Sequence, residues 1–156
     1  MNNRQPPMVP VKVWTDFKHT EGMPKYESEL ASGMDVRANE KVCLQPKETK
    51  LIGTGIYVRI PDGFEIQVRP RSGLSLKTAF RIPNSPGTVD SDYVAKEICV
   101  IAENTHGSVE MNISIGERIG QLVLNEVPQI VWDVVMTKED LGTSDRTGGF
   151  GSTGTK

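Results

Sequence analysis

Asp90, Asp92 and Tyr93 stand within four positions of one another in the stretch GTVDSDY. In a strand, alternate residues share a face, so the two carboxylates could point the same way, whereas in a turn they need not. One interpretation makes a carboxylate a general base beside an aromatic ring that packs on a sugar or a base. A hairpin whose aspartate hydrogen-bonds its own backbone explains the same pattern. By itself, the stretch favours the plain hairpin.

A second stretch, PRSGLS, collects groups that bind anions. Arg71, Ser72 and Gly73 combine a guanidinium, a hydroxyl and backbone N–H groups in front of a short helix predicted over residues 72–80, which Ser72 could cap. Helix N-termini attract anions, so the stretch is a candidate phosphate site. A Ser-Gly pair before a helix more often serves only as a cap, and both interpretations stay open.

Four other polar positions matter to the site chemistry. The stretch ASGMDVRA holds a single carboxylate, Asp35, and GERIGQLVL places Gln121 in an otherwise apolar strand. A buried amide must be hydrogen-bonded, so Gln121 either stabilises the fold or points into a site. His19 and His106 lie in separate loop-like segments without a partner pattern. We expect both histidines at the surface, which excludes a His-based metal centre.

Composition and charge narrow the function classes. The 156 residues carry a net charge of −2 with no block of like charges. A nucleic-acid polymer is therefore not expected as a ligand, although a small phosphorylated one is compatible. Cys43 and Cys99 lack a metal-type spacing and are expected to be free thiols in a reducing compartment. No signal-peptide pattern and no run of about 18 apolar residues is present, which favours a cytoplasmic protein without a membrane span.

The elements that position these residues are mostly strands. In FEIQVR, Phe64, Ile66 and Val68 alternate with polar residues, as in a half-buried strand. Further strands are predicted at residues 11–17, 50–60, 97–104, 109–115, 118–124 and 130–136, with turns at 61–63 and 105–107. The pattern favours an all-β barrel or sandwich in a single domain, residues 1–156. After residue 141 the composition turns to Gly, Ser and Thr, so we expect residues 142–156 to form a flexible C-terminal arm.

Five stretches in order, ASGMDVRA, RPRSGLS, GTVDSDY, GERIGQLVL and GGFGSTG, carry a specific resemblance. Over roughly residues 25 to 154 the chain resembles the trimeric deoxyuridine triphosphate nucleotidohydrolases (dUTPases). The resemblance implies a jelly-roll-like β barrel of the β-clip type with one short helix. It also implies a homotrimer whose active sites lie at subunit boundaries, where the arm of one subunit closes over a shared site.

The resemblance implies hydrolysis of dUTP to dUMP and pyrophosphate, which limits uracil in DNA and supplies dUMP. Asp90 matches the carboxylate that activates water for attack on the α-phosphorus, and Tyr93 matches the aromatic that packs on deoxyribose and rejects ribonucleotides. Asn84 and the hairpin backbone match the groups that recognise uracil. The backbone positions are Gly87, Thr88, Val89 and Cys99. Main-chain groups that pair with uracil would leave cytosine with unpaired buried groups.

The remaining matches concern the triphosphate and its metal. Arg71, Ser72 and Gly73 match a phosphate cradle, and Gln121 matches an amide that touches phosphate or the waters of the metal. Asp35 matches a carboxylate tied through water to Mg²⁺, the implied cofactor. In the arm, Phe150 matches the ring that stacks on uracil, and Arg146 matches the cation at the γ-phosphate. Gly151, Ser152 and Thr153 match the residues that wrap the terminal phosphate.

The sequence departs from the family pattern in three places, and two alternative functions stay open. One departure, Gly120 where alanine is more usual, is expected to have little effect. VAKE is one residue longer than usual after Tyr93, and RTGGF is one residue shorter between Arg146 and Phe150. A dCTP deaminase shares the fold, but it would need a glutamate near the base and would lack the aromatic arm motif. A non-enzymatic nucleotide-sensing or partner-binding protein would also keep the fold. The intact DSDY and GGFGSTG stretches favour the hydrolase.

Overall fold

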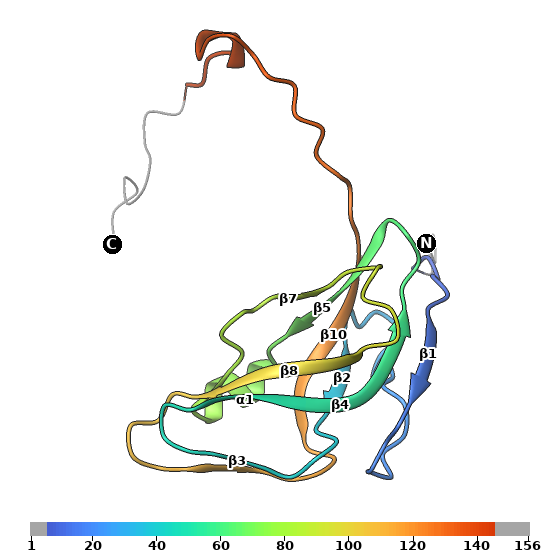
Figure 1. Cartoon of the computed structure of the whole chain (residues 1–156), viewed down its shortest axis with the longest axis vertical. Helices are drawn as coiled ribbons and strands as arrows, with labels where there is room; N and C mark the ends of the chain where they lie inside the picture. Colours follow the sequence, from blue (N-terminus) through green and yellow to red (C-terminus); the bar gives the residue numbers. More distant parts are fainter. Residues whose placement is uncertain (1–5, 146–156) are drawn as a thin grey trace.

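The computed structural model describes residues 6–145, and its regular elements are almost all antiparallel strands (Figure 1). One four-stranded sheet has the order β1-β4-β8-β6, with bounds Lys12–Thr15, Thr49–Arg59, Glu97–Asn104 and Phe80–Arg81. The second has the order β2-β10-β5-β7, with bounds Met34–Arg37, Arg118–Glu126, Phe64–Arg69 and Gly87–Val89. A two-stranded sheet pairs β3 with β9, with bounds Val42–Leu44 and Met111–Ile113. The all-β prediction is confirmed.

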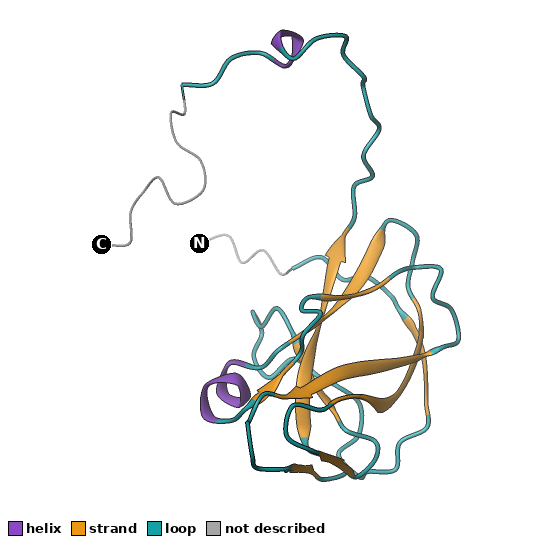
Figure 2. Ribbon diagram, turned by 60° about the vertical axis from the view of Figure 1, so that its left-hand side comes forward, coloured by secondary structure: helices purple, strands orange, loops and turns teal. Residues whose placement is uncertain are grey.

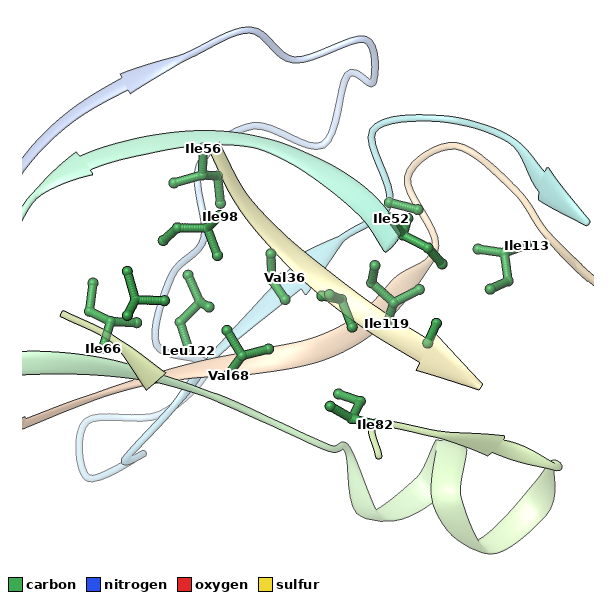
Figure 3. Packing of buried hydrophobic residues seen from close by; sticks show 14 of the residues in the cluster. Val36, Ile52, Ile56, Ile66, Val68, Ile82, Ile98, Ile113, Ile119 and Leu122 are labelled. Atoms are coloured by element: carbon green, nitrogen blue, oxygen red, sulfur yellow. The ribbon is translucent and has the colours of Figure 1, made fainter. Parts of the chain in front are cut away.

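The core lies between the two larger sheets and follows from strand alternation. In β8, every second residue from Ile98 to Asn104 is buried, while the residues between them are half-buried on the outer face. Figure 3 shows aliphatic side chains of both sheets pointing toward one another, such as Ile56 and Ile98 from one sheet and Val68 and Leu122 from the other. Burial of these side chains is the main stabilising contribution to the barrel.

The predicted strands at 64–69 and 97–104 have the bounds expected from their alternation, and those at 50–60 and 118–124 shift by one or two residues. The strand predicted at 109–115 is shorter, because only Met111–Ile113 pairs, with β3, while Val109 and Ile115 are exposed. Likewise only Lys12–Thr15 of residues 11–17 pairs with β4. No helix within residues 6–145 is long and apolar enough to cross a bilayer.

The strand predicted at 130–136 is wrong for the isolated chain. After β10 the chain leaves the barrel and runs without regular structure to a 3₁₀ turn at Glu139–Leu141 (Figures 1 and 2). A strand needs a hydrogen-bonding neighbour, and none of the described strands pairs with this segment. Its large apolar side chains are exposed, among them Trp132 at 81%. The run of apolar residues is therefore present without the partner that would make it a strand.

The predicted helix is present but shorter, as α1, Ser72–Lys77. Arg71 occupies the N-cap position and no side chain caps the helix, so Ser72 is the first helical residue and not the cap. The helix ends at Thr78, whose hydroxyl donates to the Leu74 carbonyl at 2.7 Å. The chain then becomes extended because Phe80 enters the core. Ser72 and Gly73 remain exposed at the helix start.

The two histidines have different surroundings. His106 is exposed as predicted, and its Nδ1 accepts hydrogen bonds from the backbone N–H groups of Ser108 and Val109. The surface prediction is wrong for His19, which is half-buried and stacks on Phe17 with ring centroids 4.7 Å apart. Burial, and next the nearby Arg37 cation, lower the pKa of His19, so its imidazole is neutral at neutral pH.

Candidate active site

A cavity of about 220 Å³ lies where β7 meets the outer face of β8. Six of the residues that line it were predicted as substrate-binding positions: Asn84, Gly87, Thr88, Val89, Tyr93 and Cys99. They come from two different sheets, because β7 pairs with β5 and β8 pairs with β4. The fold therefore brings together residues that the sequence places up to 15 positions apart. The size suits a nucleoside better than a whole nucleoside triphosphate.

Gly87 leaves the space that Asn84 needs in this cavity. A side chain at Gly87 would place its Cβ 3.1 Å from Nδ2 of Asn84 and 3.4 Å from Val68. Such a Cβ would displace the amide, so Gly87 leaves room for the polar side chain of Asn84 in the cavity. The backbone of β7 can therefore approach a flat ring closely.

Residues 90–93 form a turn, which decides between the strand and turn interpretations of the two carboxylates. The backbone N–H of Tyr93 donates to the Asp90 carbonyl at 3.1 Å, and that of Val94 donates to Asp92 at 2.8 Å. Asp90 and Asp92 both border a second cavity of about 280 Å³, which Gln129 also lines. Within residues 6–145 no hydrogen bond engages the Asp90 carboxylate, so it is available to a water molecule.

Tyr93 forms one wall of the first cavity. Its hydroxyl donates to the Glu97 carbonyl at 3.3 Å, and Nζ of Lys96 lies 5.2 Å from the ring centroid. Within the VAKE stretch, Ala95 has a φ of 56°, which is in the left-handed region. Tyr93 and Cys99, on either side of this turn, both line the cavity.

Cys99 contributes its position and not a reactive thiol. Burial, and next the nearby Glu97 and Glu40 carboxylates, raise the pKa of the Cys99 thiol to about 11. At neutral pH the thiol is protonated, which makes it a weak nucleophile. Glu97 also lines the cavity, but its Oε1 accepts a hydrogen bond from the Gly55 N–H at 2.7 Å. That carboxylate is therefore engaged in holding β4, which does not favour the deaminase alternative.

A charged cluster lies at the start of α1, where β2, β5 and β10 run side by side. Nε of Arg71 donates to Oδ1 of Asp35 at 2.7 Å, and Nη1 of Arg118 donates to Oδ2 of the same carboxylate at 3.2 Å. Gln121 is the β10 residue directly opposite Asp35, and its Nε2 donates to the Pro70 carbonyl at 2.9 Å. Three separate motifs thus meet at one place, and the resemblance assigns all three to the triphosphate and its metal.

Two features of this cluster were not predicted. Arg118 was not singled out, although it stands in the GERIGQ stretch three residues before Gln121. Gly33 leaves room for the Gln121 side chain, because a Cβ at Gly33 would collide with Oε1 of Gln121. Both features could have been found within the quoted motifs. Arg118 is a cation close to the polar strand residue Gln121, and Gly33 is a residue without a side chain shortly before Asp35.

The described residues do not form a metal site of their own. No group of three or more His, Cys, Asp or Glu side chains within residues 6–145 could hold an ion. Asp35, the predicted metal-linked carboxylate, has both oxygens in contact with guanidinium groups. The arm residues Arg146, Phe150, Gly151, Ser152 and Thr153 lie outside the described residues, so their roles stay predictions.

Comparison with known proteins agrees with the motifs. The family model for dUTPase matches residues 20–154. A deoxyuridine 5'-triphosphate nucleotidohydrolase of Maricaulis maris is 46% identical over 95% of this chain and 98% of its own length. The same enzyme of Fusobacterium nucleatum is 49% identical over 85% of this chain and 89% of its own length.

Solved structures confirm the fold. The dUTPase of Staphylococcus bacteriophage 80alpha, solved with dUPNHPP, has a TM-score of 0.81 and 26% identity, covering 94% of this chain and 99% of that one. The dUTPase of phage phi11 of S. aureus, in which a structural Mg(II) ion is coordinated, has a TM-score of 0.73 and 22% identity, with 84% and 99% coverage. The prediction of a jelly-roll-like dUTPase barrel is thereby confirmed.

Proposed function

The chain belongs to the dUTPase family, and from this premise we propose how its residues hydrolyse dUTP to dUMP and pyrophosphate. The observation that supports the proposal best is the cavity lined by the six predicted substrate-binding residues. Asn84 and the backbone of β7 and β8 pair with the uracil edge, and Tyr93 covers the deoxyribose. A cytosine ring there would leave buried backbone groups unpaired, which supplies the specificity.

Asp90 is the residue that orients the attacking water. Its carboxylate follows the β7 wall of the cavity directly and engages no described residue. A general base needs hydrogen-bond reach to the water that attacks the α-phosphorus, and a rigid turn keeps it in place. Arg71, Ser72, Gly73 and Gln121 bind the phosphates. The implied cofactor is Mg²⁺, which would be held mainly by the phosphate oxygens of the substrate, with Asp35 linked to it through water, and would offset charge on the leaving pyrophosphate.

We propose further that the protein is a homotrimer with active sites at subunit boundaries. In one chain, Asp35 borders a different cavity from the one that the predicted nucleoside-binding residues line. A neighbouring subunit can bring one beside the other. The segment after β10 supports association, because its apolar side chains, including Val131 and Trp132, are exposed to solvent in the single chain. The arm beyond it would close the shared site through Phe150. The cytoplasmic location expected from the sequence stays a prediction.

The deciding experiment incubates the purified protein and Mg²⁺ with dUTP, dCTP, dTTP or UTP in separate reactions. Pyrophosphate, ammonia and the nucleoside monophosphates are measured. We expect pyrophosphate and dUMP from dUTP alone, with slow or no turnover of the other three. Ammonia from dCTP would establish the deaminase instead. Tight binding of dUTP without any product would establish the non-enzymatic sensor.

A further inference from the structure

A groove of about 400 Å³ lies on the outer face of β1 and β4, beside the turn at residues 94–95. Its lining includes an aromatic pair, because Trp14 is the direct cross-strand neighbour of Tyr57 and their ring centroids are 4.9 Å apart. Trp14 is 63% exposed in the single chain. Tryptophan, tyrosine and arginine side chains that share a groove are typical of protein contact surfaces, and Arg59 lines the same groove. The groove is therefore a candidate docking surface.

The groove carries two cations without a counter-charge. Lys12 and Arg59 are direct cross-strand neighbours, two residues along from the aromatic pair on the same face. Like charges directly opposite each other destabilise a strand pair. Within residues 6–145 neither side chain forms an ion pair or a hydrogen bond, and no Asp or Glu lines the groove. An occupant with carboxylates and an apolar side chain would fit both parts of this surface.

The loop before β2 carries this complementary chemistry. Glu27 and Glu29 are exposed, and neither side chain has a hydrogen-bond or ion-pair partner within residues 6–145. The backbone N–H of Ala31 donates to the Ser28 carbonyl at 3.1 Å, which forms a turn whose central residues are Glu29 and Leu30. The Leu30 side chain is 78% exposed at the tip of that turn. The loop thus presents two carboxylates and one apolar side chain together.

This loop, residues 26–31, lies on the other side of the sheet from the groove of its own chain. Tyr26 lines a cavity together with Ile56, which lies on the core side of β4. Lys12 and Trp14 point to the outer side, because successive strand residues alternate between the two faces. The groove is therefore left to a second copy of the chain.

The segment after β10 is another exposed apolar stretch, but its charges match the groove less well. Residues 130–136 contain one carboxylate, Asp133, for the two cations. Farther along, Asp140 already accepts a hydrogen bond from the Thr137 N–H at 3.0 Å. The loop before β2 offers two unengaged carboxylates, which match the two cations of the groove one to one.

We propose that the loop of residues 26–31 docks in the groove of a second copy of the chain. Leu30 packs on Trp14, and the two glutamates of the loop pair with the two cations of the groove. The inference rests on the proposed homotrimer and dUTP hydrolysis, and it names surfaces that hold neighbouring subunits together. Because the loop and the groove are different surfaces, the contact is heterologous, and such contacts generate rings when the rotation closes.

Docking would bring the two halves of the proposed active site together. The groove wall at residues 94–95 directly follows Tyr93, which lines the nucleoside cavity. Leu30 precedes Asp35 by five residues, so the two lie at most about 18 Å apart along an extended chain. The charged cluster at Asp35 of one copy would therefore lie near the nucleoside cavity of the next.

Charge reversal tests the contact by sedimentation equilibrium at low salt. The groove variant, Lys12→Glu with Arg59→Glu, and the loop variant, Glu27→Lys with Glu29→Lys, each create repulsion across the contact. Each should raise the chain concentration at half-dissociation by at least about 10-fold. The variant with all four reversals has opposite charges again and should return to within about threefold of the unaltered protein. Such a rescue separates a broken contact from a misfolded chain.

Lys18→Glu with Lys41→Glu is the matched control for the groove variant. Both lysines are exposed, and neither lines the groove. The control makes the same change in net charge, so its half-dissociation concentration should change less than about threefold if the groove itself forms the contact.

A carbodiimide, which joins a lysine to a carboxylate without a spacer, identifies the neighbour directly. Isotopically labelled and unlabelled chains are unfolded, mixed and refolded together, and mass spectrometry detects linked peptides of mixed isotope. We expect Lys12 to be linked to Glu27 or Glu29 of the other copy. A link from Lys12 to Asp133 or Glu139 instead would assign the groove to the segment after β10 and overturn the inference.

The inference is also overturned if the variant with four reversals shows no rescue, or if no link joins Lys12 to another copy. A chain that stays monomeric at every concentration would overturn both the homotrimer and the contact. Failure of the proposed hydrolysis is a separate outcome, because it requires that the unaltered protein release no pyrophosphate from dUTP. Sedimentation and cross-linking need no substrate, so they report on the contact alone.

Discussion

The hydroxyl of Tyr93 donates a hydrogen bond to the main-chain carbonyl of Glu97 at 3.3 Å, closing a five-residue loop beside the nucleoside cavity. The loop contains the residue by which this chain is longer than the family pattern. Because the hydrogen bond and the left-handed Ala95 fix the loop together, the ring keeps its place at the cavity wall. The ring lines the cavity and the hydroxyl holds the loop, so the two roles can be tested separately.

Removal of the ring should relax sugar selectivity. We expect Tyr93→Ala to lower kcat/KM for dUTP and to narrow the ratio between dUTP and UTP by at least about 10-fold, since a ribose 2′-hydroxyl then finds space. Tyr93→Phe keeps the ring and loses one hydrogen bond, so both values should stay within about fivefold. Steady-state kinetics on both nucleotides check this. An unchanged ratio in Tyr93→Ala would show that the ring does not face the sugar.

Alternation predicted the strands well wherever a strand has a partner inside the chain. Strand β5 at Phe64–Arg69 follows from its own residues because one face packs on the core. Residues 130–136 are apolar at every position except Asp133, yet they pair with none of the described strands. A run of apolar side chains shows which groups need burial and not which element buries them. Strand pairing needs a hydrogen-bonding partner, and the residues of this segment do not identify one.

The site was predictable as motifs but not as contacts. Asn84, Tyr93 and Cys99 were named from the resemblance, and they meet in one cavity. The contact of Arg118 with Asp35 lies beside a bulge that shifts the register by one residue, and a period-two interpretation assumes that no such shift occurs. His19 was missed for a similar reason, because a loop-like stretch can still fold against an aromatic ring.

Asp90 should carry the chemical step. Asp90→Asn keeps the shape of the turn and removes the base, so kcat should fall by about 10²- to 10⁴-fold while dUpNHpp still binds within about threefold. Asp92→Asn is the matched control, since Asp92 borders the same cavity two residues later, and its kcat should fall less than tenfold. Comparable losses in both variants would mean that the carboxylates act as a pair or that the turn has collapsed.

The arm should matter for catalysis but not for folding. A chain ending at residue 141 retains all strands and the helix, so its thermal unfolding and its oligomeric state should match those of the full chain. Its kcat/KM for dUTP should drop by at least about 100-fold, because the site stays open to water. A chain ending at Gly154 keeps the GGFGSTG stretch and serves as the control. Light scattering measures the oligomeric state, and pyrophosphate release measures the activity. Full activity in the shorter chain would show that the arm has no part in the mechanism.

Asn104 should be among the most sensitive core positions. It is fully buried, and its Nδ2 faces the carbonyls of Leu44, Gln45 and Val109, the last at 2.8 Å. Asn104→Ala leaves these acceptors without a donor, so the free energy of unfolding should fall by about 2–4 kcal/mol.

The exposed Asn112, in strand β9, provides the control for this substitution. Its amide contacts only Glu110 among the described side chains, so Asn112→Ala should change stability by less than about 0.5 kcal/mol. Urea titration at one fixed chain concentration compares the variants. Equal effects would show that water replaces the Asn104 amide.

Cys99 should resist alkylation at neutral pH and respond steeply to base. In a Cys43→Ser background it is the only thiol of the chain, so mass spectrometry can follow its reaction with iodoacetamide directly. A pKa raised to about 11 means that the thiolate fraction, and with it the rate, should rise about tenfold for each pH unit from 7 to 10 without a plateau. Bound dUpNHpp should slow the reaction further, since Cys99 lines the nucleoside cavity. A plateau near pH 9, or labelling indifferent to the analogue, would place the thiol in open solvent outside the cavity.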